Sequence, residues 1–227
     1  MSIAENIQEI ENELKGSACR LIAVTKTKPI DDLQQAYNSG CKCFGENKVQ
    51  EMVDKYEQLP KNIEWHMIGH LQSNKVKYMA SFVHLIHGVD SFDLLKEINK
   101  RAVQNGRIQN CLLQVHIAQE ETKFGFDFKE IEALLISKSI DQFQNVKIIG
   151  LMGMASNSSD MNLIRNEFKG LKLFFEKLKS SFNSDRLEMK ELSMGMSGDY
   201  KIAVEEGSTL VRIGSKIFGE RNNVSVV

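Results

Sequence analysis

Two lysines follow directly after an apolar run near the start of the chain. Residues 21–29 read LIAVTKTKP, in which the first four residues have the length and composition of a buried strand, and Lys26 and Lys28 come at its end. An amine at the edge of an apolar core loses hydration, which lowers its pKa and frees its lone pair to attack a carbonyl group. The pattern is compatible with a Schiff base on Lys26 and equally with a pair of solvated loop lysines.

Two stretches rich in glycine and serine lie in the C-terminal third. Residues 191–199 read ELSMGMSGD and residues 208–220 read STLVRIGSKIFGE. Each is a predicted strand followed by glycine and hydroxyl residues and then a helix start, which offers free backbone N–H groups and hydroxyls to an anion. We predict that Ser197, Gly214 and Ser215 bind a phosphate group, and the alternative is a pair of capped turns.

A reactive amine and a phosphate site together indicate a phosphorylated aldehyde. Pyridoxal 5′-phosphate (PLP) is the commonest cofactor of this kind, and a Schiff-base aldolase acting on a sugar phosphate is the rival interpretation. Arg212 favours PLP, because an inward guanidinium could donate to the pyridine nitrogen and would not give up its own proton. The alternative for Arg212 is an outward salt bridge.

Strand-like and helix-like segments alternate along the chain, and they must position these side chains. The first segment is an amphipathic helix, with Ile3, Ile7, Ile10 and Leu14 at helical spacing. Strands are predicted at 20–25, 42–44, 63–68, 83–86, 111–117, 146–151, 188–193 and 209–213. Helices are predicted at 30–38, 46–57, 74–80, 92–105, 127–139, 160–181, 199–206 and 215–218.

Eight strand–helix units predict an α/β fold, a (β/α)8 TIM barrel that forms a single domain over residues 1–227. An open doubly wound sheet is disfavoured because no G-x-G-x-x-G follows the first strand. In a barrel the chemistry lies at the C-terminal ends of the strands, where Lys26 falls. Asn47, in the stretch FGEN after the second strand, is interpreted on its own as an ordinary helix N-cap.

Composition excludes several classes of protein. The 227 residues are 42% apolar and 26% charged with a net charge of −1, which is typical of a globular protein and gives no basic surface for nucleic acid. No apolar run approaches the ~18 residues of a membrane span, and the first residues lack the pattern of a signal peptide. We therefore expect a cytoplasmic protein without a membrane or nucleic-acid partner, and a monomer.

The cysteines and histidines do not show the spacing of a metal site. Cys41 and Cys43 form C-x-C rather than C-x-x-C, and we expect them to share a core-facing side of one strand. His66 and His70 are four residues apart but lie at a predicted strand end rather than on a helix. We expect no metal.

Six motifs resemble, in order and spacing, the pyridoxal phosphate homeostasis protein family: AVTKTKP, FGENKVQE, WHMIGHLQSNK, GLMGMA, LSMGMSGDY and AVEEGSTLVRIGSKIFGER. The resemblance implies the fold type III PLP-binding barrel of alanine racemase, without a second domain. It implies that Lys26 carries PLP as a Schiff base, that Asn47 lies near the ring and that Arg212 faces the pyridine nitrogen. It also implies that Ser197, Gly214 and Ser215 hold the phosphate, that Ser193 and Met194 line the pocket, and more weakly that His66 and Met152 contribute.

The resemblance implies a PLP carrier and regulator without catalytic residues, which serves PLP-dependent apoenzymes. An amino-acid racemase of low activity is the alternative. Racemisation in this fold requires two bases, and in alanine racemase a tyrosine from a second domain is one of them. The sequence ends soon after the eighth predicted strand, and none of its four tyrosines has sequence support as a base, so we favour the carrier.

Overall fold

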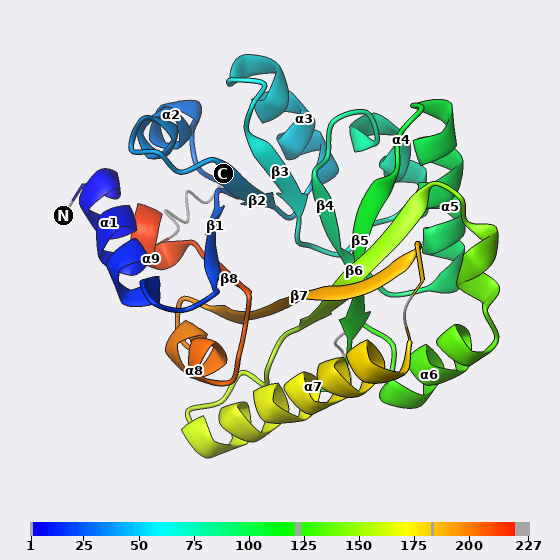
Figure 1. Ribbon diagram of the computed structural model, residues 1–227. Helices are drawn as coiled ribbons and strands as arrows, with labels where there is room; N and C mark the ends of the chain where they lie inside the picture. Colours follow the sequence, from blue (N-terminus) through cyan, green and yellow to red (C-terminus); the bar gives the residue numbers. More distant parts are fainter. Residues whose placement is uncertain (1, 121–123, 183, 221–227) are drawn as a thin grey trace.

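Eight parallel strands pair in sequence order, and β8 pairs with β1 to close a barrel (Figure 1). The computed structural model describes residues 2–120, 124–182 and 184–220. The strands are β1 (Arg20–Val24), β2 (Cys43–Glu46), β3 (Glu64–Met67), β4 (Leu85–Val89), β5 (Gln109–Val115), β6 (Val146–Gly153), β7 (Leu187–Met196) and β8 (Leu210–Ile213). The helices are α1 (Ile3–Leu14), α2 (Ile30–Asn38), α3 (Val49–Gln58), α4 (Val76–Met79), α5 (Phe92–Gln104), α6 (Phe128–Ile136), α7 (Met161–Ser181), α8 (Tyr200–Glu205) and α9 (Ser215–Phe218), with 3-10 turns η1 (Ser73–Lys75) and η2 (Ser139–Gln142).

The barrel and its order of elements confirm the predicted fold class, and the differences are local. β4 begins at Leu85, two residues later than predicted. The interpretation of Asn47 as an N-cap is wrong, because α3 begins at Val49 with Lys48 at the cap position. Asn47 instead packs against the end of β3, where a Cβ added to Gly69 would lie 2.7 Å from the Asn47 carbonyl oxygen.

Apolar side chains form two cores. The larger core lies between the strands and the surrounding helices and includes Ala23, Phe44 and Trp65. The smaller core fills the inside of the barrel with side chains from β1, β4, β5, β6 and β8: Ile22, Leu85, Leu112, Met152 and Leu210. Adjacent residues such as Ile22 and Ala23 belong to different cores because successive side chains of a strand point to opposite faces.

The two cysteines of the C-x-C pair do not share a face, contrary to prediction. β2 begins only at Cys43, so Cys41 lies in the preceding loop and packs into the outer core, whereas Cys43 packs against the inner core. The strand periodicity that underlay the prediction therefore does not extend back to Cys41. Within the described part of the chain, no helix combines the length and apolar character that crossing a bilayer requires.

Candidate functional site

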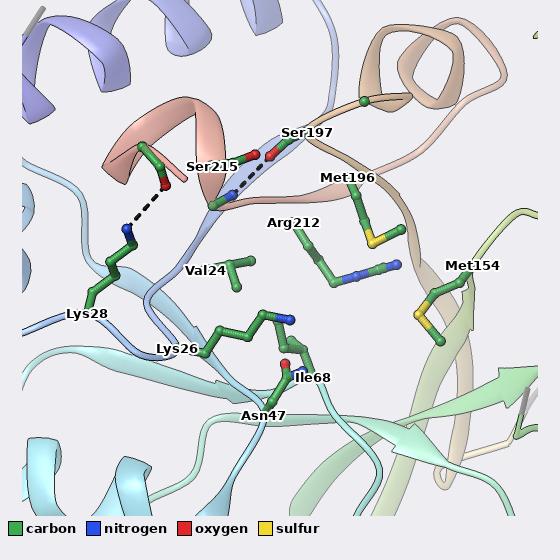
Figure 2. Close-up of a pocket in the computed structure, with 13 residues that line it drawn as sticks. Val24, Lys26, Lys28, Asn47, Ile68, Met154, Met196, Ser197, Arg212 and Ser215 are labelled. Carbon is green, nitrogen blue, oxygen red and sulfur yellow. Dashed lines mark hydrogen bonds between the residues drawn. The ribbon is translucent and has the colours of Figure 1, made fainter. Parts of the chain in front are cut away.

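A cavity of about 310 Å³ opens at the C-terminal mouth of the barrel (Figure 2). It is lined by Val24, Lys26, Lys28, Asn47, Ile68, Met154, Met196, Ser197, Gly198, Arg212, Gly214, Ser215 and Gly219. This volume is within the range of small-molecule sites. Its position agrees with the general placement of chemistry in such barrels.

The structure brings six of the eight residues proposed from the sequence to this cavity: Lys26, Asn47, Ser197, Arg212, Gly214 and Ser215. Ser193 lies deeper, where its Oγ accepts a hydrogen bond of 2.6 Å from Arg212 Nη1. Met194 packs into the outer core, because it alternates with the inward-facing Ser193 along β7. Met152 lies in the inner core and His66 is buried within the barrel, so neither lines the cavity.

The loop that carries Lys26 is held in an unusual backbone conformation. Thr27 has φ of 65°, in the left-handed region that a β-branched residue rarely adopts. Its backbone N–H donates to the Glu51 carboxylate at 2.5 Å. Figure 2 shows the Lys26 side chain extending into the cavity between Asn47 and Arg212.

A buried ionic cluster lies beneath this loop. Lys55 Nζ donates to the Thr25 carbonyl at 2.7 Å, to Glu46 at 2.7 Å and to Glu51 at 2.6 Å. The Thr25 hydroxyl donates to the same Glu46 oxygen at 2.6 Å. Burial raises the pKa of Glu46 and the ammonium of Lys55 opposes that rise. The cluster fixes the loop between β1 and α2, and thereby the point at which the Lys26 side chain begins.

Sequence reasoning missed this cluster, although one signal was present. Glu51 and Lys55 are four residues apart on α3, the spacing of an ion pair on a helix. Such pairs are usually exposed, so the spacing alone gives no reason to place Lys55 in the interior, where only 7% of its side chain is exposed.

Lys28 points away from the centre of the cavity. Its Nζ donates to the carbonyl oxygens of Phe218, Gly219 and Glu220 at 2.9, 3.1 and 3.2 Å. Figure 2 shows this contact at the rim, separated from the Lys26 amine. Lys28 therefore attaches the end of α9 to the first loop, and it is not simply a solvated loop lysine.

Hydroxyl and amide groups from the ends of β7 and β8 meet on the opposite side of the cavity. The Gly214 N–H donates to Ser197 Oγ at 3.2 Å, and Ser215 begins α9. A Cβ added to Gly214 would lie 3.2 Å from both the Cβ and the carbonyl oxygen of Val24, so the absence of a side chain permits the close approach of β8 to β1. The two serine- and glycine-containing loops are thus adjacent in space, as an anion site requires.

Arg212 points into the barrel and begins a buried chain of hydrogen bonds. Its Nη2 donates to the Gly153 carbonyl at 3.1 Å, and its Nη1 donates to Ser193. His87 Nδ1 lies 2.9 Å from Ser193 Oγ, and His66 Nδ1 lies 3.0 Å from His87 Nε2. The outward salt bridge considered for Arg212 is not formed.

Burial determines which members of this hydrogen-bonded chain of side chains are charged. It lowers the pKa of Arg212 to about 10, so the guanidinium remains charged at neutral pH. It lowers the pKa of His66 to about 3 and that of His87 well below its usual value, so both imidazoles are neutral. The cavity therefore has a positive charge on its floor, and the described residues that line it include no acidic side chain.

These features fit an anionic aldehyde, because an amine, a guanidinium, two hydroxyls and the backbone at the start of α9 converge on one space. The sequence profile of the alanine racemase N-terminal domain family matches residues 1–222. The pyridoxal phosphate homeostasis protein of Aquifex aeolicus (strain VF5) is 40% identical over 222 residues, which cover 96% of this chain and 95% of that protein.

The chain belongs to the pyridoxal phosphate homeostasis protein family.

Solved structures related to this family support the assignment. PipY of Synechococcus elongatus PCC7942 is 34% identical, and its structure without PLP has a TM-score of 0.89 over 96% of this chain and 100% of that chain. The PipY structure with PLP bound has a TM-score of 0.86 with the same coverage. The family predicted from the six motifs is thereby confirmed.

Alanine racemase of Bartonella henselae shares the barrel with this pyridoxal phosphate homeostasis protein family member. The TM-score is 0.70 at 16% identity, over 97% of this chain and 60% of the racemase chain. At that identity the likeness shows the fold alone, so the reaction of the racemase is not transferred to this chain.

Proposed function

We propose that this chain binds pyridoxal 5′-phosphate as a Schiff base on Lys26 and takes part in intracellular PLP homeostasis without a dedicated reaction. The observation that carries this proposal is the lining of the cavity at the C-terminal mouth of the barrel, here called the upper cavity. There the Lys26 amine and the Arg212 guanidinium point inward, and the loops after β7 and β8 face them. The names of the curated relatives and the PLP bound to PipY agree with it.

Each group has a role in holding the cofactor. PLP supplies an aldehyde that condenses with a primary amine, and a ring that can accept electrons from a bound amino acid. Ser197, Ser215 and the N–H groups at the start of α9 would bind the phosphate, and Asn47 would contact the ring. Arg212 would face the pyridine nitrogen and would leave it unprotonated, because a guanidinium with a pKa near 10 retains its protons at neutral pH.

The same cavity argues against racemisation. A racemase of this fold requires a base on each side of the substrate, and the described lining residues include no histidine, carboxylate, cysteine or tyrosine. Tyr200, the tyrosine nearest in sequence to the phosphate loops, donates its hydroxyl to Glu13 and accepts a hydrogen bond of 3.1 Å from Lys216. An arginine at the pyridine nitrogen also weakens the ring as an electron acceptor, which disfavours carbanion formation.

The test is the visible spectrum of the purified protein before and after borohydride reduction. The wild-type protein loaded with PLP is expected to show the absorption of a protonated Schiff base, which borohydride removes. Lys26→Ala is expected to lack the band, whereas Lys48→Ala, at an exposed position on the same side of the barrel, retains it. A colourless loaded wild-type protein would contradict the proposal and return the aldolase to consideration.

The racemase alternative has its own test. A chiral assay against a panel of amino acids is expected to show no turnover above that of free PLP. Turnover that Lys26→Ala abolishes would replace the carrier with an enzyme.

Further proposals concern partners, assembly and location. An open cavity at the end of the barrel is suited to transfer, so PLP-dependent apoenzymes are proposed as recipients of PLP. A net charge of −1 on a closed barrel is compatible with a monomer, and four free cysteine thiols are compatible with the reducing cytoplasm. Activation of an apo-aminotransferase by the loaded protein, at a rate that excess PLP phosphatase does not reduce, would support direct transfer, and a rate equal to that of free PLP would exclude it.

A further inference from the structure

The opposite, N-terminal mouth of the barrel holds a compact group of metal-ligand atoms. One ligand atom each from Cys43, Glu64 and His66 lie within 4.8 Å of one another. A fourth donor is adjacent, because His84 Nε2 lies 3.7 Å from Glu64 Oε2. The set comprises a thiol, a carboxylate and two imidazoles, and none of these residues belongs to the upper cavity.

Strand register places these side chains together. Cys43 and Glu64 are directly opposite each other on the neighbouring strands β2 and β3. Glu64 and His66 are two residues apart on β3 and so share a face, which is the inside of the barrel because Trp65 between them packs in the outer core. His84 immediately precedes β4, the next strand. Cys43, Glu64 and His66 therefore belong to the barrel wall, and His84 lies directly beside it.

His66 provides the independent indication of a ligand. The residue is 2% exposed, and its Nδ1 is occupied by His87. Its other nitrogen, Nε2, is buried and has no hydrogen-bond partner among the described residues. A buried polar atom without a partner is unfavourable and calls for an explanation. Because Nδ1 contacts His87, Nε2 is the His66 nitrogen that remains available to a metal.

We propose that Cys43 Sγ, the Glu64 carboxylate, His66 Nε2 and His84 Nε2 form a binding site for a divalent metal ion of the zinc class. Sulfur and imidazole donors with one carboxylate are the ligands that Zn²⁺ prefers in four-coordinate sites. On binding, the Cys43 S–H bond breaks, the proton passes to solvent and a sulfur–metal bond forms, with no change of oxidation state. The thiolate and the carboxylate together balance the two charges of the ion.

The residues around the proposed site give a metal ion access from solvent and partly neutralise the nearby positive charge. A cavity of about 420 Å³ beside α1 is lined in part by Arg20, Cys41 and Cys43 and opens this end of the barrel to solvent. The Glu64 and His84 side chains are 42% and 44% exposed, so they can adjust to an entering ion. Lys15 and Lys42 also line this cavity. Arg20 is paired with Glu191 at 2.7 Å, which offsets its repulsion of a metal.

The buried histidine chain supplies the support that metal ligands usually have. A ligating imidazole is held by a hydrogen bond at its second nitrogen, which fixes the tautomer and the ring orientation. His87 makes that contact with His66, and Ser193 in turn connects His87 to Arg212. The proposed metal site and the floor of the upper cavity are thus the two ends of one hydrogen-bonded chain.

The test is equilibrium binding of Zn²⁺ to the full chain, first dialysed against a chelator and kept reduced with a phosphine, in competition with a chromophoric chelator. One ion per chain is expected for the wild-type protein, and Co²⁺ in its place is expected to give a thiolate-to-metal absorption band. Changes in supporting contacts typically reduce metal affinity 10–100-fold, so Cys43→Ser, which removes a ligand, is expected to lower it by about 100-fold or more and abolish the band.

The matched control is Cys41→Ser, which alters the other thiol of the C-x-C pair outside the ligand set and is expected to bind within about threefold of wild type. Glu64→Gln, at a partly exposed position, serves as a second ligand variant if Cys43→Ser does not fold. Lys26→Ala is expected to bind Zn²⁺ as tightly as wild type, so failure of the zinc proposal can be distinguished from failure of the PLP proposal. Wild-type protein that binds no ion, or ligand variants that bind as tightly as wild type, would overturn the proposal.

Discussion

The two mouths of the barrel differ in chemistry although the same strands build both. The upper mouth presents an amine, a guanidinium and hydroxyls and is suited to an anion. The lower mouth presents a thiol, a carboxylate and two imidazoles, the donors of the proposed cation site. In barrels of this kind the upper face usually carries function and the lower face stability. The donor atoms gathered at the lower mouth depart from this tendency, and the proposed metal site would account for them.

The two regions also differ in how they are held. Lys26 depends on a strained loop supported by the buried Lys55 cluster, whereas Cys43, Glu64 and His66 are fixed by strand register. Between them, Ser193 and His87 are the shared contacts. Substitutions can therefore be chosen to affect the upper mouth alone or both mouths together.

Lys55→Met is expected to have the largest effect and to act on the upper mouth. It leaves Glu46 and Glu51 without their partner in the interior, so the free energy of unfolding is expected to fall by about 3–5 kcal/mol, with weaker PLP binding. Urea denaturation measures the first effect and PLP titration the second.

Lys147→Met is the matched control, because Lys147 pairs with Glu188 at 2.6 Å on the surface. Its effect is expected to stay within about 1 kcal/mol. If Lys55→Met and Lys147→Met lower the free energy of unfolding equally, the buried cluster does not support the loop.

Ser193→Ala is expected to act on both mouths. It removes the acceptor for Arg212 Nη1 and the partner of His87 Nδ1, and leaving buried groups unpaired costs about 1–3 kcal/mol of stability. We expect weaker binding of both PLP and Zn²⁺, measured by titration of each. Ser197→Ala should weaken PLP binding alone, and an unchanged Zn²⁺ affinity in Ser193→Ala would separate the two sites.

The histidine chain predicts how stability depends on pH in metal-free protein. The folded-state pKa values of His66 and His87 lie below the usual 6.5, so between pH 6.5 and about 3 the unfolded chain binds more protons than the folded one. The contribution of the two neutral histidines to the free energy of unfolding is therefore fully present above pH 6.5. It falls as the pH decreases, by at most about 1.4 kcal/mol per pH unit for each histidine.

Urea denaturation between pH 7 and pH 5 measures this slope. The groups that face the pair are His84, Arg20 and Arg212, whose charges reinforce the effect of burial on the two histidines. His87→Asn is expected to reduce the slope of the free energy of unfolding against pH, because about one proton fewer is taken up on unfolding. If the free energy of unfolding of the wild-type protein does not change over this pH range, the folded protein protonates the two histidines as readily as the unfolded chain does, which would contradict the prediction.

Lys28→Ala is expected to have the smallest effect. It removes the contacts to the carbonyls after α9, which are worth about 1 kcal/mol, and leaves the Lys26 amine in place. We expect a small fall in melting temperature and an unchanged Schiff-base spectrum. Loss of the spectrum with normal stability would move the site of attachment from Lys26 to Lys28.

The sequence predicted the upper mouth better than the lower one for a physical reason. Lys26, Ser197 and Gly214 each lie within two residues of the end of a strand. In a parallel barrel all such positions share one end, so linear motifs were sufficient. Ser193 and Met194 show the limit, because a shift of one residue along β7 exchanges the interior for the outer core. Thr27 and Lys55 could not be anticipated, since backbone strain and a buried ion pair arise only from tertiary packing.

The donor cluster at the lower mouth was not predicted from the sequence, because its side chains are contributed by different strands. Spacing rules for metal sites describe ligands within one short segment, and Cys43 lies 21 residues before Glu64. Only the register of β2 against β3 shows that the two side chains are neighbours. The irregular start of β2 also made the C-x-C pair misleading, because Cys41 is not part of the strand.

The most direct test of the account is the location of the covalent bond to the cofactor. Wild-type protein loaded with PLP, reduced with borohydride, digested and analysed by mass spectrometry is expected to carry the pyridoxyl group on Lys26. A label on Lys28 in Lys26→Ala would show that the neighbouring lysine can accept the aldehyde when the first is lost. A label on any other lysine of the wild-type protein, or no label at all, would contradict the central claim.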